Sequence, residues 1–82
     1  DDVRPLRDMF NLQELNLVGT QVRDIAPLGK LSKLQVLDLE GTQVDDVRPL
    51  AGLHGLRALN LGGSRVTDVT ALGNVAGLTI RR

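Results

Sequence analysis

Two pairs of adjacent carboxylates, Asp1-Asp2 and Asp45-Asp46, are the residues of this sequence whose types could support acid–base chemistry. Carboxylates held close together can share a proton and divide the roles of general acid and general base. Each pair opens the same six-residue string, DDVRPL, and the two strings begin 44 residues apart. A string that returns unchanged in a chain of 82 residues indicates a repeated structural unit instead of two separate sites.

The second Asp of the pair recurs at a fixed place, at Asp24, Asp46 and Asp68, whereas the first is replaced by Arg23 or Thr67. An Asp at the start of a short helical turn accepts a backbone N–H and acts as its N-cap. We therefore interpret the recurring Asp as a helix cap and its neighbour as a solvated side chain. The same reasoning assigns Asp2 as a cap.

The remaining candidates for chemistry do not form a set. His54 is the single histidine and there is no cysteine, so neither a Ser-His-Asp nor a Cys-His arrangement can be assembled. The stretch Leu61–Arg65, LGGSR, lacks the GxxxxGK[ST] spacing of a phosphate-binding loop. The sequence predicts no catalytic residue, no cofactor and no metal site, and hence a protein that is not an enzyme.

The charge balance excludes other classes of partner. Ten basic and ten acidic side chains cancel, and Phe10 is the single aromatic residue, so the basic stripe with stacking aromatics that nucleic-acid binding needs is absent. No apolar run approaches the roughly 18 residues of a membrane span. We predict neither nucleic-acid nor membrane binding, and the cellular compartment stays open.

The sequence falls into register at a period of 22 residues, half of the separation between the two DDVRPL strings. Each copy begins with the spacing L-x-x-L-x-L, with leucines at Leu12, Leu15, Leu17, Leu34, Leu37, Leu39, Leu56, Leu59 and Leu61. A period of this length with this spacing is typical of a stacked solenoid. We predict one array over residues 1–82, with half a repeat at 1–11, full repeats at 12–33, 34–55 and 56–77, and a partial repeat at 78–82.

Each copy predicts a strand, a turn and a short helix. The alternating leucines fit a strand with one buried face, and Gly19-Thr20 with its counterparts Gly41-Thr42 and Gly63-Ser64 ends it. Pro27 and Pro49 fit the first turn of a short helix or 3-10 piece. One copy cannot enclose its own aliphatic side chains, so we expect the copies to stack and their strands to form one parallel sheet.

The string LQVLDLEGTQVDDVRPLAGL, from Leu34 to Leu53, resembles the leucine-rich repeat family, in particular its internalin-like and phosphatase-regulator-like subclass with 22-residue repeats, which points to a bacterial source. The resemblance implies an α/β solenoid with a curved parallel sheet on the concave side and short 3-10 or α-helical turns on the convex side. Thr20, Thr42 and Ser64 stand where the family places a laddering Asn. We interpret these hydroxyls as structural, with bonds to backbone.

The resemblance also implies a binding surface, because the concave face of the family binds partners. The outward positions of the strands and of the residues just after them are Glu14, Asn16, Val18, Val36, Asp38, Glu40, Ala58, Asn60 and Gly62. Three of these residues are acidic and none is basic. This set predicts a protein partner with a basic or polar contact surface; ordinary solubilising scatter is the alternative interpretation.

The two ends of the sequence carry further expectations. Solenoids need polar caps, but the chain begins in mid-repeat at Asp1, and Arg81 falls where the other copies have a buried leucine. We expect a fragment of a longer repeat protein or, as the alternative, a short array that self-associates through uncapped ends. We expect Phe10 to cover one end of the core.

The functional prediction is a non-catalytic protein–protein interaction module that binds its partner on the concave sheet face. The alternative is a regulatory or substrate-recruiting segment of a larger enzyme or signalling protein, with any catalysis in another domain. One fold hosts many functions, so the repeat alone does not select the partner.

Overall fold

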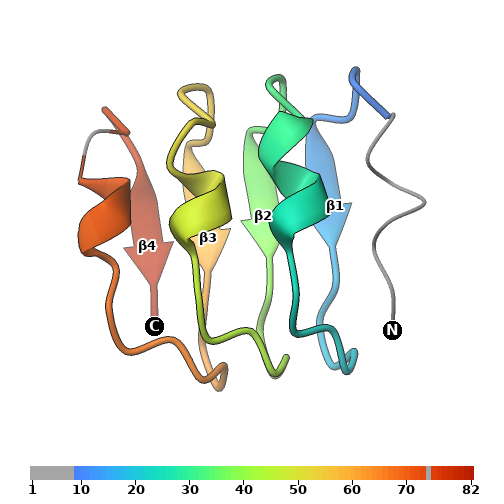
Figure 1. Ribbon diagram of the computed structural model, residues 1–82, viewed down its shortest axis with the longest axis vertical. Helices are drawn as coiled ribbons and strands as arrows, with labels where there is room; N and C mark the ends of the chain where they lie inside the picture. The colour runs from blue at the N-terminus through green and yellow to red at the C-terminus, as the bar shows by residue number, and fades with distance from the viewer. Residues whose placement is uncertain (1–8, 74) are drawn as a thin grey trace.

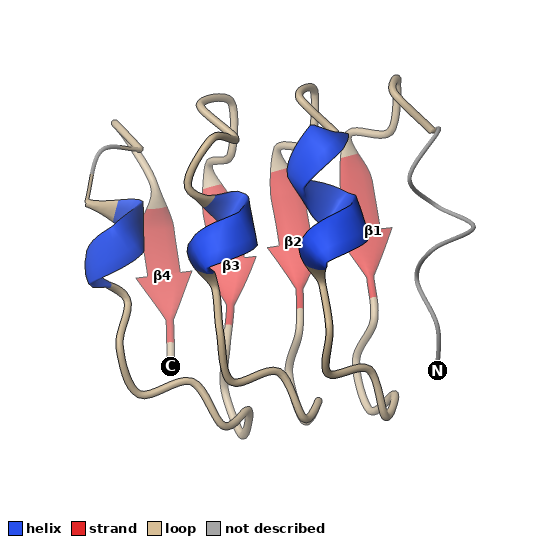
Figure 2. Ribbon diagram, viewed as in Figure 1, coloured by secondary structure: helices blue, strands red, loops and turns tan. Residues whose placement is uncertain are grey.

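The computed structural model describes residues 9–73 and 75–82, and in these the chain alternates between a short strand and a 3-10 helix (Figures 1 and 2). The strands form one parallel sheet in the order of the chain, and they are β1 (Glu14–Asn16), β2 (Val36–Asp38), β3 (Ala58–Asn60) and β4 (Thr79–Arg81). The 3-10 helices cover one side of the sheet, and they are η2 (Ala26–Lys30), η3 (Arg48–Leu50) and η4 (Thr70–Leu72). The predicted solenoid of parallel strands and short 3-10 turns is confirmed.

The core lies between the sheet and the 3-10 helices. In β2 and β3 the central leucines, Leu37 and Leu59, are paired in register and almost fully buried, as is Leu50 of η3. Their counterpart in β1, Leu15, is half-buried and packs against the same cluster. Stacked copies thus bury leucines that one copy would leave in water, which is the main stabilisation available to so short a unit. Phe10 is 53% exposed and lies outside this cluster, so the expectation that it covers the core is wrong.

The turns after the strands depend on glycine and on a hydroxyl. Gly41 has φ of 71°, a left-handed conformation that side chains disfavour, and the turn glycines of the neighbouring copies share it. The hydroxyl of Thr42, which is 3% exposed, donates to the carbonyl oxygen of Leu39 at 2.7 Å. Thr20 and Ser64 make the equivalent bond within their own copies. The structural role predicted for these hydroxyls is confirmed, and their bonds run within a copy and not between copies.

The start of each 3-10 helix differs from the prediction by one residue. The N-cap residues are Ile25, Val47 and Val69, and their side chains make no capping hydrogen bond. The preceding residues, Asp24, Asp46 and Asp68, accept the N–H two residues later through Oδ1 at 2.9 Å. The N-cap is therefore one residue later than predicted. The first 3-10 hydrogen bond of each helix is accepted by the carbonyl of the residue after the Asp, as in the bond from Leu50 N–H to the Val47 carbonyl. They form Asx turns that satisfy the first helical N–H. The Asp1-Asp2 pair lies outside the described residues.

The last strand differs from the 22-residue period. In β4, Ile80 pairs with Leu59 and Arg81 pairs with Asn60, so the spacing between β3 and β4 is 21 residues. Ile80 packs against the core and Arg81 is exposed. The prediction that Arg81 falls at a buried leucine position is wrong. Placing Ile80 inward avoids burying an unpaired guanidinium, and Gly77, with φ of 77°, supports the shorter connection.

No helix among the described residues is both long and apolar enough to cross a membrane.

Candidate partner-binding face

The side of the sheet that faces away from the 3-10 helices is the candidate site, and we call it the sheet face. Its central row consists of the last residue of each strand, namely Asn16, Asp38, Asn60 and Arg81, held in register by the strand pairing. A second row holds the first residue of each strand, namely Glu14, Val36, Ala58 and Thr79. Neighbouring strands are about 4.8 Å apart, so each row is a line of side chains across the sheet.

The central row also closes the strand ends. Asp38 accepts the N–H of Glu40 through Oδ1 at 3.1 Å, and Asn60 accepts the N–H of Gly62 in the same way at 3.0 Å. Asn16 makes the corresponding bond to Val18. Amide and carboxylate side chains can both accept this bond, which explains why Asn and Asp alternate in the row. The second polar atom of each of these side chains remains for contacts with another molecule.

The charged side chains of the sheet face lie apart from the ion pairs recorded in residues 9–73 and 75–82. Glu14, Asp38, Glu40 and Arg81 make no ion pair with any residue in the described part of the chain. Arg81 lies among them because of the 21-residue spacing. The prediction that the outward strand positions carry no base is therefore wrong.

The ion pairs lie elsewhere on the molecule. Arg23 and Asp45, which are 22 residues apart, approach to 3.4 Å in the segments between strands and 3-10 helices. At the start of η3, the guanidinium of Arg48 approaches Asp46 Oδ2 to 2.7 Å, and this hydrogen bond lowers the pKa of Asp46 to about 2. The pKa of Asp68 is also lowered, first by the N–H of Thr70 and then by its hydroxyl. Asp46 and Asp68 thus have partners within their own copy and hold the start of a 3-10 helix, whereas the partner of Asp45 lies in the preceding copy.

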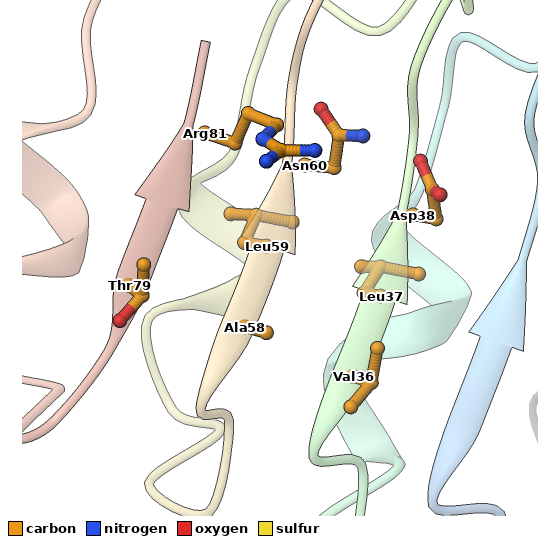
Figure 3. A pocket seen from close by; sticks show the side chains of 8 residues that line it. All are labelled: Val36, Leu37, Asp38, Ala58, Leu59, Asn60, Thr79 and Arg81. Carbon is orange, nitrogen blue, oxygen red and sulfur yellow. The ribbon is translucent and has the colours of Figure 1, made fainter.

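A shallow hollow of about 320 Å³ lies on the sheet face across β2, β3 and β4, and its lining consists of Val36, Leu37, Asp38, Ala58, Leu59, Asn60, Thr79 and Arg81 (Figure 3). The guanidinium of Arg81 extends from β4 toward Asn60, and Asp38 lies on the far side of Asn60. The hollow thus has a cationic end and an anionic end.

The nine residues predicted from sequence to contact a partner are distributed unevenly over the face. Four of them, Val36, Asp38, Ala58 and Asn60, line the hollow. The other five are Glu14, Asn16, Val18, Glu40 and Gly62, which lie in or just after β1, β2 and β3. Val18 and Val36 are 44% and 39% exposed and give the face some apolar surface.

Sequence reasoning missed Thr79 and Arg81. The alternation Thr79-Ile80-Arg81, polar then apolar then polar, is the signal that could have placed both on the outward side. No group of three His, Cys, Asp or Glu residues that could hold a metal ion occurs in residues 9–73 and 75–82. The sheet face presents charged, hydrogen-bonding and apolar side chains.

Comparisons with known proteins agree with this architecture. A family model described as leucine-rich repeats (two copies) matches residues 10–52, slightly more than half of the chain. No curated protein matches. The crystal structure of an internalin (inlF) from Listeria monocytogenes aligns with a TM-score of 0.91 and 28% identity over 98% of this chain and 24% of that one. Internalin C2 from the same organism aligns with a TM-score of 0.77 and 32% identity over 96% of this chain and 46% of that one. The chain thus spans about a quarter and under half of the two internalins.

Proposed function

Because the chain belongs to the leucine-rich repeat family, we propose that it is a protein–protein interaction module that binds its partner on the sheet face and catalyses no reaction. The observation that carries the proposal is the stacking of outward side chains in register on the sheet face. Strand pairing aligns Asn16, Asp38 and Asn60 in one row. Glu14, Asp38 and Glu40 on this face make no ion pair among the described residues. They are therefore available to a partner at no cost of breaking internal ion pairs.

The proposed contact surface consists of Glu14, Asn16, Val18, Val36, Asp38, Glu40, Ala58, Asn60 and Gly62. Its acidic members are Glu14 on β1, Asp38 on β2 and Glu40 two residues after β2. A partner that contacts these residues presents basic or polar groups. Val18 and Val36 supply apolar area of the kind found in the centre of interfaces.

Affinity capture with the purified chain, using a lysate of the organism that encodes it, tests the proposal. Each captured protein is purified and its Kd is measured against the wild type and two variants, Glu40→Lys and Asp45→Lys. The variants change the net charge equally, but only Glu40 lies on the sheet face and makes no side-chain bond within the described residues.

We expect Glu40→Lys to weaken binding by roughly 3- to 30-fold and Asp45→Lys to leave the Kd within twofold. Equal effects of the two variants would show a response to net charge alone and would contradict binding on the sheet face.

A further inference from the structure

We propose that the hollow between β2 and β4 binds a partner segment carrying two opposite charges, a basic side chain against Asp38 and an acidic side chain against Arg81. The inference rests on the proposed sheet-face function and names the chemistry of the partner. A uniformly basic partner would suit the acidic side chains of the sheet face but would be repelled by Arg81 of β4.

Arg81 provides the cationic end of the hollow. It lines the hollow, it is exposed, and its guanidinium makes no hydrogen bond or ion pair with the described residues. A guanidinium presents its donors in a planar fork that matches the two oxygens of a carboxylate. An acidic side chain is the protein group that satisfies this geometry.

Asn60 lies between the two ends of the hollow. Its Oδ1 accepts the N–H of Gly62 at 3.0 Å, so its Nδ2 is the atom that remains to donate. In Figure 3 this nitrogen lies on the side of Asp38. The guanidinium of Arg81 is therefore the group that would bind the partner's carboxylate.

Asp38 provides the anionic end of the hollow. It uses Oδ1 for the N–H of Glu40, which leaves Oδ2 as an acceptor. Asp38 makes no ion pair within the described residues. An ammonium or guanidinium of the partner could therefore bind this carboxylate without displacing an internal ion pair.

The two ends of the hollow belong to strands that are not neighbours. The backbones at Asp38 and Arg81 are two strand spacings apart, about 10 Å. The two side chains form no ion pair in the described part of the chain. An extended segment covers the same distance in three residues. Val36 and Ala58, at the first positions of β2 and β3, also line the hollow and give it apolar surface for the aliphatic stems of the bound side chains.

A titration with three blocked tetrapeptides tests the proposal by NMR at low ionic strength. The probes are acetyl-Lys-Gly-Gly-Glu-amide, its di-Lys analogue and its di-Glu analogue. The side-chain N–H resonances of Asn60 and Arg81 report binding in the hollow, and those of Arg65 serve as an off-site control. The variants are Arg81→Glu, which breaks no side-chain bond to the described residues, and Asp38→Asn, which keeps the turn acceptor found in Asn16 and Asn60.

We expect the wild type to bind the Lys/Glu peptide roughly two- to fivefold more tightly than either analogue, as exposed ion pairs allow. Arg81→Glu should prefer the di-Lys peptide, and Asp38→Asn should lose the preference for Lys/Glu over di-Glu. A wild type that prefers di-Lys, or that shows no shifts at Asn60 and Arg81, overturns the inference. The proposed function would then still be decided by the Glu40→Lys comparison, which does not depend on the order of charges.

Discussion

The junction between β2 and β3 and the junction between β3 and β4 use the same parallel pairing but differ in length by one residue. Leu37 and Leu59 are 22 residues apart, whereas Leu59 and Ile80 are 21 apart. A strand alternates its side chains, so a one-residue difference exchanges its two faces. Two factors therefore decide which residues of a strand reach the sheet face: the length of the connection that precedes the strand and the free energy cost of burying a charged side chain.

The largest effect expected from this comparison is on stability. Replacing Ile80 by Ala removes a half-buried side chain from the core and should lower the free energy of unfolding by about 1 to 3 kcal/mol. Leu59→Ala, at the fully buried counterpart, should cost about 2 to 5 kcal/mol. Arg81→Ala should stay within about 0.5 kcal/mol because this side chain is exposed. Urea unfolding measures all three.

A larger loss from Arg81→Ala than from Ile80→Ala would contradict the register of β4. Such a result would return β4 to the 22-residue period and remove Arg81 from the sheet face. The two variants therefore decide, from stability alone, which of two adjacent residues faces the core.

The regular copies were predictable from sequence because one signal dominates them. The spacing of Leu34, Leu37 and Leu39 repeats with its neighbours, and buried leucines at a fixed period leave few alternatives for the chain. At β4 two signals compete, since the period places Arg81 inward and the local alternation places Ile80 inward. The repeat period alone does not decide which of the two residues faces the core. The free energy cost of burying an unpaired guanidinium favours Ile80.

The outline of the candidate site was predictable for the same reason. Outward positions of the first three strands follow directly from the leucine period, whereas Thr79 and Arg81 follow only once the register of β4 is known. The bonds of Asp38 and Asn60 to the turn after each strand were also not predicted. They depend on backbone geometry at the strand end, which the residue pattern does not specify.

A smaller effect is expected at the short connection before β4. Gly77 has φ of 77° and a Cβ built on it would meet no atom within 4 Å, so Gly77→Ala tests backbone conformation without a steric clash. We expect a loss of about 1 kcal/mol in the free energy of unfolding, the usual cost of a left-handed non-glycine residue.

Gly52→Ala is the matched control, because its surroundings are equally open and its φ lies outside the left-handed region. It should be neutral or raise the stability by up to about 1 kcal/mol through the unfolded chain. If Gly77→Ala behaves like Gly52→Ala in thermal or urea unfolding, the connection does not depend on a left-handed residue.

The smallest expected effect is on the pH dependence of stability, and it distinguishes the equivalent carboxylates of Asp46 and Asp68, which precede η3 and η4. The pKa of Asp46 is lowered from 3.8 to about 2 by its bonds to Arg48, and that of Asp68 is lowered by its bonds to Thr70. A carboxyl group whose pKa is depressed in the folded state contributes stability above its unfolded pKa, and this contribution is lost as the pH falls through the folded value. Stability should therefore fall between about pH 4 and pH 2, and less steeply in Asp46→Asn.

Salt distinguishes the two carboxylates. The partner of Asp46 is a charged guanidinium, so 0.5 M NaCl should reduce the difference between Asp46→Asn and wild type in this pH range. The partners of Asp68 are a neutral hydroxyl and a backbone N–H, so the difference between Asp68→Asn and wild type should change little with salt. Both substitutions keep an Oδ1 that can accept the turn N–H, which leaves the titrating charge as the altered property. An equal salt response at the two positions would mean that Arg48 does not hold Asp46 in solution.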